Sequence, residues 1–383
     1  MMIFLDIWYH KFSDVVNIDT EDKSDISVRR CKLYTDTVKK IPRIFKKGLV
    51  PLNVMFTDEF STDYGGPTRE FFTEIFGLVV GKLVHGDSRN FTFIHDLVRL
   101  GNNEYLYFGF ITALALVHGC PGPRYFCKSV VDFIFRGDAE PTIEEVADSE
   151  MKEKLKELRE CNDRELFENQ MKVFFERFDS GFVAATVSYE EKDNLLKTMA
   201  RHHVISCAHE EITQYITGIR IGHVLSALKC HESKFLKEFI YDEKLITADC
   251  IKRIFKVKYS SILEESRLEK DVYYNFLTMF ETLEDAPCEV EIQEFESNKI
   301  IIKPFTLADV LQYISGSRFL PLYSDTSYLV EFVHNCEPGR RGVAHSCTCV
   351  VNLPTTPRYL DEDNFVKNFL EDVVENSKQF SLA

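Results

Sequence analysis

A short run around residue 350 brings a thiol, an imidazole and a hydroxyl together. Residues 344–354 read Ala-His-Ser-Cys-Thr-Cys-Val-Val-Asn-Leu-Pro. A cysteine here can form a covalent thioester, because the thiolate is the strongest side-chain nucleophile near neutral pH. If residues 343–351 are extended, His345, Cys347 and Cys349 point to the same face, since side chains alternate along a strand. The imidazole then lies beside Cys347 and favours its ionised form.

Spacing alone leaves a structural alternative open, because a cysteine within a strand commonly acts as a small apolar residue. The run, however, resembles the active-site signature of HECT-type ubiquitin ligases, in which His-Thr-Cys-Phe-Asn leads through mostly apolar residues to Leu-Pro. The positions that keep this register without a gap are His345, Cys347, Leu353 and Pro354. Ser346 replaces the Thr by another small hydroxyl. Thr348 and Cys349 stand where Phe and Asn are usual.

Two further blocks extend the resemblance along the chain. Residues 52–59 followed by residues 63–72 look like the N-terminal signature of the same domain. Residues 309–318 resemble a segment that the family has in the early part of its C-terminal lobe. The three blocks occur in the family's order, so the resemblance covers about residue 28 to the end.

The resemblance implies an α+β, bilobal HECT-like fold with an α-rich N-terminal lobe and a smaller α/β C-terminal lobe. Residues 1–27 are then an N-terminal segment, residues 28–262 the lobe that receives a conjugating enzyme, and residues 263–383 the lobe with the catalytic cysteine. Residues 256–270 are rich in charge and serine, which suits an exposed connection between lobes. Residues 11–30 are polar and suggest a linker or a frayed terminus.

Hydrophobic periodicity predicts several elements of the first lobe. Residues 52–56 alternate in part as a strand, Gly65-Gly66 makes a turn, and Pro67 suits the first position of a helix. The apolar residues at helical spacing that should face a core are Phe71, Phe72, Ile75, Phe76 and Val79. Residues 104–118 predict a buried helix, which the proline- and glycine-rich residues 120–123 must end.

Two more helical segments follow from composition and spacing. Residues 144–170 predict a charged, solvated helical segment whose sparse inner face is Leu155, Leu158 and Leu166. A last helix follows the acidic residues 361–363, whose carboxylates suit a helix N-terminus. Its apolar stripe, expected to dock on the lobe that holds Cys347, consists of Phe365, Val366, Phe369, Leu370, Val373 and Val374.

Charge and cysteine content disfavour several classes of protein. The net charge of −15, from 46 basic and 61 acidic residues, disfavours nucleic acid as a partner, because phosphates need a basic surface. Eleven cysteines without a CxxC spacing give neither a zinc ribbon nor a thioredoxin-like motif. No run approaches the roughly 20 apolar residues that span a bilayer. We therefore expect no membrane partner, and reduced thiols in the cytosol or nucleus.

One cluster has the residue types of a metal site: His202, His203, Cys207 and His209. His203 and Cys207 are four residues apart, which places both on one face of a helix. Zinc usually takes four ligands, and no second cluster with matching spacing lies nearby in the sequence. We therefore expect ordinary positions of an amphipathic helix, and no metal.

The resemblance implies a HECT-type ubiquitin-protein transferase whose partners are ubiquitin, a ubiquitin-conjugating enzyme and a protein substrate. By that resemblance, Cys347 carries the glycyl thioester, with His345 and Ser346 supporting it. The aromatic residue near the chain end, Phe380, corresponds to one that many members need for transfer to lysine. No cofactor is implied, because the thioester already holds the energy for transfer.

Two other classes of function stay open. A cysteine hydrolase would pair Cys347 with a distant histidine, such as His118 or His334, and would split the thioester with water. A catalytically silent HECT-like module would bind proteins without transferring ubiquitin.

Overall fold

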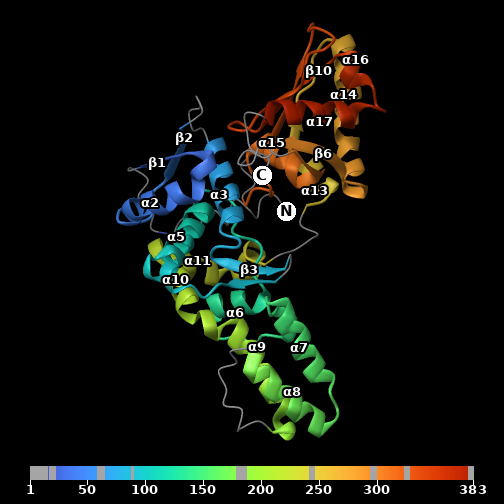
Figure 1. Cartoon of the computed structure of the whole chain (residues 1–383). Coiled ribbons are helices and arrows are strands. Elements are labelled where there is room, and N and C mark those ends of the chain that lie inside the picture. The colour runs from blue at the N-terminus through green and yellow to red at the C-terminus, as the bar shows by residue number, and fades with distance from the viewer. Residues whose placement is uncertain are drawn as a thin grey trace.

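The computed structural model describes residue 16 and residues 23–57, 65–87, 90–177, 188–240, 246–293, 300–322 and 328–377. Helices and short strands alternate along these residues, which confirms the predicted α+β class. Figure 1 shows the orange and red elements gathered at one end, with the blue to yellow elements beside and below them. No helix within these ranges is both long enough and apolar enough to pass through a membrane.

Two separate hydrophobic cores divide the described residues. The first collects buried side chains from Val16 to Phe239, and the second from Ala248 to Val373. The division predicted after residue 262 stays a prediction of domain organisation. Along the chain, the second core begins before residue 262, because the helix and strand of residues 248–257 contribute Ile251 and other buried side chains to it.

The first core is mainly helical. Its α-helices are α2 (Leu33–Phe45), α3 (Gly66–Leu78), α4 (Leu97–Gly101), α5 (Glu104–Val117), α6 (Lys128–Arg136), α7 (Ser149–Glu160), α8 (Arg164–Arg177), α9 (Lys192–Val204), α10 (His209–Ile219), α11 (Val224–Cys230) and α12 (Glu232–Phe235). Two small sheets accompany them. β1 (Ser24–Val28) pairs in parallel with β2 (Leu52–Phe56), and β3 (Val84–Asp87) pairs antiparallel with β4 (Asn90–Phe93).

The predicted strand, turn and helix around residues 52–79 are confirmed as β2, a turn and α3. Gly65 precedes α3 with φ of 104°, a conformation that glycine adopts without steric cost, and Pro67 lies in the first turn. The predicted inner face is buried as a whole: Phe71, Phe72, Ile75, Phe76 and Val79. α3 is therefore fixed in the first core along one full face.

The predicted buried helix is α5, and it crosses α10 at very short range. A Cβ added at Gly109 of α5 would lie 2.0 Å from the carbonyl oxygen of Tyr215, and one at Gly218 of α10 would lie 2.1 Å from that of Leu106. Only glycine permits two helix backbones to approach so closely. The pair forms the centre of the first core.

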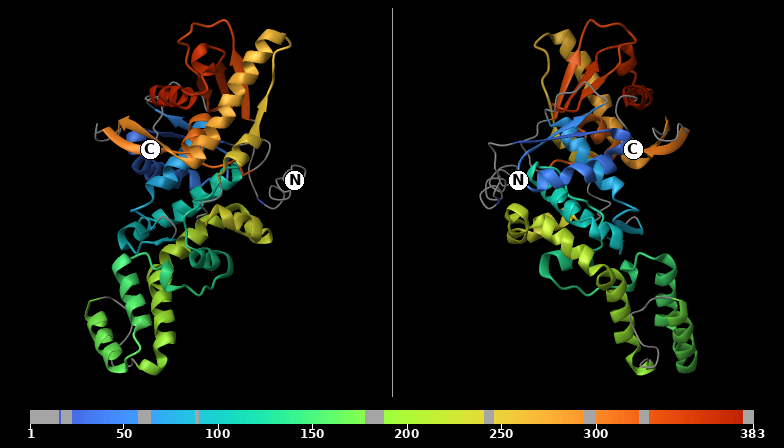
Figure 2. Two further views of the ribbon diagram at one scale, coloured as in Figure 1. Left: turned by 90° about the vertical axis from the view of Figure 1, so that its right-hand side faces the viewer. Right: turned by 60° about the vertical axis from the view of Figure 1, so that its left-hand side comes forward.

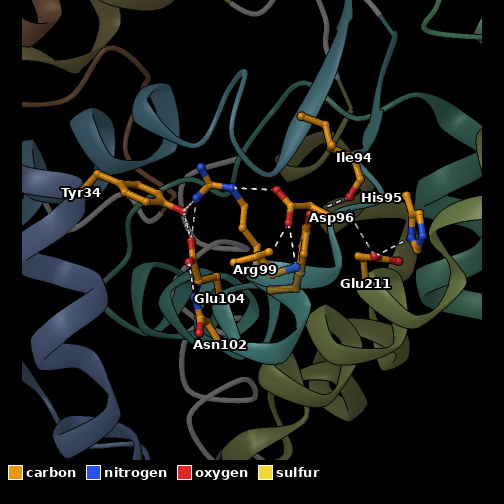
Figure 3. A network of polar contacts seen from close by, with 10 residues as sticks. Tyr34, Ile94, His95, Asp96, Arg99, Asn102, Glu104 and Glu211 are labelled. Atoms are coloured by element: carbon orange, nitrogen blue, oxygen red, sulfur yellow. Dashed lines mark hydrogen bonds and ion pairs between the residues drawn. The ribbon is translucent and has the colours of Figure 1, made fainter.

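A polar network joins α2, α4, α5 and α10 at the edge of this core (Figure 3). Tyr34 donates to Glu104, and the Arg99 guanidinium lies 2.8 Å from the same carboxylate. Burial, together with Glu104, raises the pKa of Tyr34 above its ordinary value, so the phenol stays a donor. The Asp96 carboxylate accepts the Arg99 amide at 3.0 Å and caps α4. His95 and Glu211, 2.8 Å apart, extend the network to α10.

Residues 24–30, predicted as part of a polar linker, belong to the first core instead. Ile26 and Val28 of β1 are buried, and β1 satisfies its backbone by pairing with β2. Arg30 then forms an ion pair with Glu70 of α3. The prediction was wrong because only alternate residues of this short polar segment face inward, which is a weak signal in a five-residue strand.

α7, α8 and α9 project from the body at the end opposite to the second core, as both views in Figure 2 show. The predicted inner residues Leu155 and Leu158 of α7 are buried. Leu166 is not, because residues 161–163 break the helix and reset its phase. The inner face of α8 is Phe167, Met171 and Phe174, whereas Leu166 is 51% exposed.

The second core is built on a sheet with the order β5-β8-β10-β9. β5 (Phe255–Val257), β8 (Tyr328–Val333) and β10 (Val350–Pro354) run parallel, and β9 (Val343–His345) is antiparallel to β10. β6 (Cys288–Gln293) and β7 (Ile300–Phe305) form a separate antiparallel pair. The helices are α13 (Ala248–Ile254), α14 (Leu263–Asp285), α15 (Leu307–Ser315), α16 (Pro357–Leu360) and α17 (Phe365–Ser377).

α14 adds to one prediction, and α17 confirms another. Residues 256–270, predicted as an exposed connection, are mostly exposed, and they contain the end of β5 and the first turns of α14. Glu269 is buried there and accepts the Ser260 amide at 2.7 Å, which fixes the segment to the helix. α17 begins after the acidic residues as predicted, and buries Phe369 and Val373 in the core that also contains β10.

The change of helix phase in α8 gives a matched pair of variants. Phe167→Ala removes a fully buried ring and should lower the free energy of unfolding by about 3–5 kcal/mol. Leu166→Ser, one residue away, should change it by about 0.5 kcal/mol or less. Chemical unfolding followed by circular dichroism measures both. Equal effects of the two substitutions would contradict the observed phase.

Candidate active site

Residues 346–349 form a tight turn between β9 and β10, so the extended run predicted from the sequence is wrong here. His345 pairs with Val350 across the two strands. The Thr348 amide donates to the carbonyl oxygen of His345 at 3.1 Å, and Cys349 adopts φ of 54°. A left-handed residue reverses the chain locally and interrupts the alternation of side chains. The three predicted residues therefore do not share one strand face.

The two cysteines of the turn have different surroundings. Cys349 is 1% exposed and packs in the second core. Burial raises the pKa of its thiol, although the nearby Arg69 guanidinium acts in the opposite direction. Cys347 is partly exposed. Because the thiolate is the reactive form, a buried neutral thiol is a poor nucleophile. The structure thus leaves Cys347 as the more exposed cysteine of the pair.

The imidazole of His345 is exposed, and its hydrogen-bond partner is Asn352. The Nε2 atom lies 3.1 Å from Nδ2 of that residue on β10. With the amide as donor, Nε2 accepts and the neutral ring carries its proton on Nδ1. Among the described residues, no hydrogen bond joins this ring to Cys347. The expected pairing of His345 with Cys347 therefore stays a prediction. Asn352 was missed from the sequence because it becomes a neighbour of His345 only once the turn is made.

Arg69 of α3 reaches from the first core to this turn, and sequence reasoning assigned it no role. Its Nε donates to the carbonyl oxygen of Ser315 at 2.8 Å. Its Nη2 lies 2.5 Å from the carbonyl oxygen of Ser346, 3.3 Å from that of Cys347 and 3.4 Å from Sγ of Cys349. One guanidinium therefore connects α3, the end of α15 and the cysteine turn. The sequence pointed to Arg69 only through its place in residues 63–72, the block that resembles a family signature.

Glycines make this approach possible. A Cβ added at Gly66 would lie 2.8 Å from the amide nitrogen of Cys347 and 2.9 Å from Oγ of Ser346. Gly316, with φ of 78°, would place a Cβ 2.9 Å from the carbonyl oxygen of Gly66. The first turn of α3 thus lies directly against the cysteine turn on one side and the end of α15 on the other. The Gly65-Gly66 pair, predicted only as a turn, is also a contact surface.

Two carboxylates of α3 lie at the same contact between the cores. Arg30 holds both oxygens of Glu70, at 2.7 and 2.9 Å. Oε1 of Glu74 accepts from Nε2 of Gln312 on α15 at 2.8 Å. Burial first, and then the neighbouring Glu70, raises the pKa of Glu74 to about 7. The charge of Glu74 therefore changes near neutral pH at a point where the two cores meet.

The histidines considered for a hydrolase are engaged elsewhere. Nε2 of His118 accepts the Leu52 amide at 2.8 Å, so the basic nitrogen is used in the first core. The His334 ring lies between Glu269, 2.8 Å from Nε2, and Thr355, 3.0 Å from Nδ1. A general base needs a free acceptor nitrogen within reach of the nucleophile. Neither ring offers one to Cys347 in this arrangement.

The cluster weighed as a metal site is spread over the ends of α9 and α10. The Cys207 thiol donates to the carbonyl oxygen of His203, and His209 packs edge-on against Phe133. Within the ranges that the structure describes, no three or more His, Cys, Asp and Glu side chains gather in a way that could hold a metal ion. Phe380 lies outside the described residues.

No protein-family model matches the chain. It is similar to the G2/M phase-specific E3 ubiquitin-protein ligase of Gallus gallus, with 22% identity over 286 residues, which cover 74% of this chain and 35% of that protein. The ligase of the same name from Homo sapiens is 20% identical over 209 residues, or 53% of this chain and 29% of its own length. The chain is distantly related to an E3 ubiquitin-protein ligase.

The chain spans about a third of the length of these curated relatives. The sequence of its middle region, in residues 190–193, 201–203, 245–249 and 255–256, by itself predicts a relationship to the same G2/M phase-specific ligase. That predicted relationship is confirmed at the level of an E3 ligase. This relationship concerns E3 ligases in general and does not extend to the HECT mechanism.

Glu74 gives a prediction on pH. Its pKa of about 7 in the folded protein exceeds the ordinary value of 4.5, so the folded state holds the proton more tightly than the unfolded chain. Its burial should therefore cost stability increasingly as pH rises from 4.5 to about 7. Glu74→Gln removes this titration, and its melting temperature should rise relative to the wild type between about pH 5 and pH 8. The exposed Glu210, changed to Gln, is the control. A difference from the wild type that is constant with pH would contradict the assignment.

Proposed function

We propose that the chain is a HECT-type ubiquitin-protein ligase in which the two cores correspond to two lobes. It accepts ubiquitin from a conjugating enzyme as a thioester on Cys347 and transfers it to a lysine of a protein substrate. One observation carries the proposal: a partly exposed cysteine lies in a turn between two cores, beside a buried second cysteine. The distant relationship to E3 ligases supports the same conclusion.

The loading step is an exchange between two thiols. The Cys347 sulfur attacks the carbonyl carbon of the thioester, a new C–S bond forms, and the sulfur of the conjugating enzyme departs with the electron pair of the broken bond. The two thioesters are similar in energy, so access and orientation decide the rate. Cys347 is partly exposed, so its sulfur is the reactive group of the turn.

The outer face of α8 fits the proposed conjugating enzyme. Leu166 and Val173, seven residues apart and so on one face, are 51% and 63% exposed. They lie on the part of the first core that projects farthest from the second (Figures 1 and 2). Exposed apolar patches rimmed by polar residues mark protein contacts. We propose this face as the docking surface, from which the donor must be brought to Cys347 by movement of the cores.

Incubation with a ubiquitin-charged conjugating enzyme tests the function. We expect a ubiquitin adduct that thiols reverse, seen on a non-reducing gel. Cys347→Ala should abolish it, because the accessible sulfur is lost. Cys349→Ala should keep most of it, because Cys349 is buried and serves packing.

The other outcomes separate the alternatives. Release of free ubiquitin without an adduct would point to a cysteine hydrolase. Neither adduct nor release would point to a silent binding module. An adduct that survives Cys347→Ala but is lost in Cys349→Ala would exchange the roles of the two cysteines.

The docking surface has its own test. Leu166→Ser combined with Val173→Ser should lower the loading rate at limiting donor by about tenfold, equal to the loss of about 1.4 kcal/mol of binding free energy. Leu97→Ser combined with Val98→Ser is the matched control, because these aliphatic residues of α4 are 69% and 73% exposed. Equal effects of the two pairs would contradict docking on α8. Melting temperatures show whether each variant keeps its fold.

A further inference from the structure

We infer that Arg69 is a positioning residue that orients Cys347 for transfer of its acyl group. The inference rests on the proposed function and deepens it, because it gives the first core a part in the chemistry of a cysteine in the second. Arg69 acts through the backbone of the turn, and α3 supplies it from the first core.

The contacts of Arg69 fix the direction of the Cys347 side chain. Nη2 binds the carbonyl oxygen of Ser346, which belongs to the peptide unit before the Cys347 Cα, at 2.5 Å. The same nitrogen lies 3.3 Å from the Cys347 carbonyl oxygen, in the peptide unit after it. Because peptide units are planar, contacts to both carbonyl oxygens restrict the two backbone dihedrals of Cys347 and hence the direction of its Cα–Cβ bond. The position of the sulfur then depends on one side-chain rotation.

Arg69 is held by contacts beyond those with the turn. A Cβ at Gly65 would lie 2.9 Å from Nη1 of Arg69, so the guanidinium folds back over a glycine that leaves it room. Its Nε is bound to Ser315 at the end of α15. Thr73, one helical turn farther along α3, donates to the carbonyl oxygen of Gly316 at 3.2 Å. α15 and the turn both belong to the second core, so they hold the guanidinium together when the two cores are in contact.

The geometry assigns this contact to the second step of the reaction. In loading, the donor on α8 must meet Cys347, although α8 and the second core lie at opposite ends of the molecule (Figures 1 and 2). The turn must therefore leave Arg69 for that step. In transfer, only a lysine has to approach, so the turn can stay bound to Arg69.

The transfer step gains from a sulfur whose position is restricted. The lysine nitrogen attacks the carbonyl carbon, a C–N bond forms, and the C–S bond breaks with its electron pair returning to the Cys347 sulfur. The amine proton passes to solvent. A fixed sulfur holds the thioester carbonyl group in one direction, so the lysine nitrogen can approach its carbon in line.

Single-turnover kinetics of the full chain test the assignment. The wild type and variants are loaded from ubiquitin-charged conjugating enzyme, loading is stopped, and the adduct is chased with free lysine at increasing concentration. Arg69→Ala should load to the wild-type extent, but its maximal discharge rate should fall by about tenfold or more, with little change in the lysine concentration that gives half of that rate. Arg69→Lys should recover part of the rate, because an ammonium keeps the charge but cannot bind Ser315 and Ser346 as a fork.

A second variant tests the contact without removing the charge. Gly66→Ala suits a helix start, but its Cβ would lie 2.8 Å from the Cys347 amide nitrogen and should displace the turn. We expect the same loss of discharge rate. Arg253→Ala, at an arginine of α13 whose side chain is 76% exposed, is the control and should discharge at the wild-type rate.

The outcomes distinguish this inference from the proposed function. A wild type that forms no thioester would overturn the proposed function and this inference with it. A wild type that loads and discharges, together with an Arg69→Ala variant that discharges equally fast, would overturn the inference alone. An Arg69→Ala variant that has a lower melting temperature and loses loading and discharge to the same extent would also overturn it, because this result would show a purely structural role.

Discussion

The contact between the two cores depends on hydrogen bonds to backbone carbonyls, and the Arg69 guanidinium supplies most of those at the cysteine turn. Each core buries its own apolar side chains, so each keeps its internal packing if this contact opens. A polar contact of this kind can form and separate without exposing a core. The pair Glu74 and Gln312 has the same character, with the difference that the charge of Glu74 changes near neutral pH.

The close approach of α3 to the turn is a steric condition for that contact. Any side chain at Gly66 would meet the Cys347 amide, and any at Gly316 would meet the Gly66 carbonyl. The helix start, the end of α15 and the turn therefore fit together only with backbone against backbone. The polar network around Arg99 has the opposite role, because it lies within the first core and ties its helices together (Figure 3).

The turn separates two tasks between two cysteines. Cys349 is buried, adopts a left-handed conformation and anchors the turn in the second core. Cys347 stays partly exposed, as a nucleophile that must exchange acyl groups with large partners requires. His345 is oriented by Asn352 across the hairpin. The proposed ligase therefore has its reactive sulfur on a turn shaped by both cores, with its donor docked at the distant α8.

The sequence by itself determined the elements whose signal is local. The apolar spacing of α3, α5 and α17, the strand β2 and the choice of Cys347 as the candidate nucleophile could all be predicted. Only the tertiary structure decided that Cys347 lies in a turn, that Arg69 reaches it and that Asn352 holds His345. It also moved residues 248–257 into the second core and reset the phase of α8 after residue 163. The physical reason is that periodicity reports which face of one segment is buried, whereas a contact between residues 277 positions apart depends on the whole path of the chain.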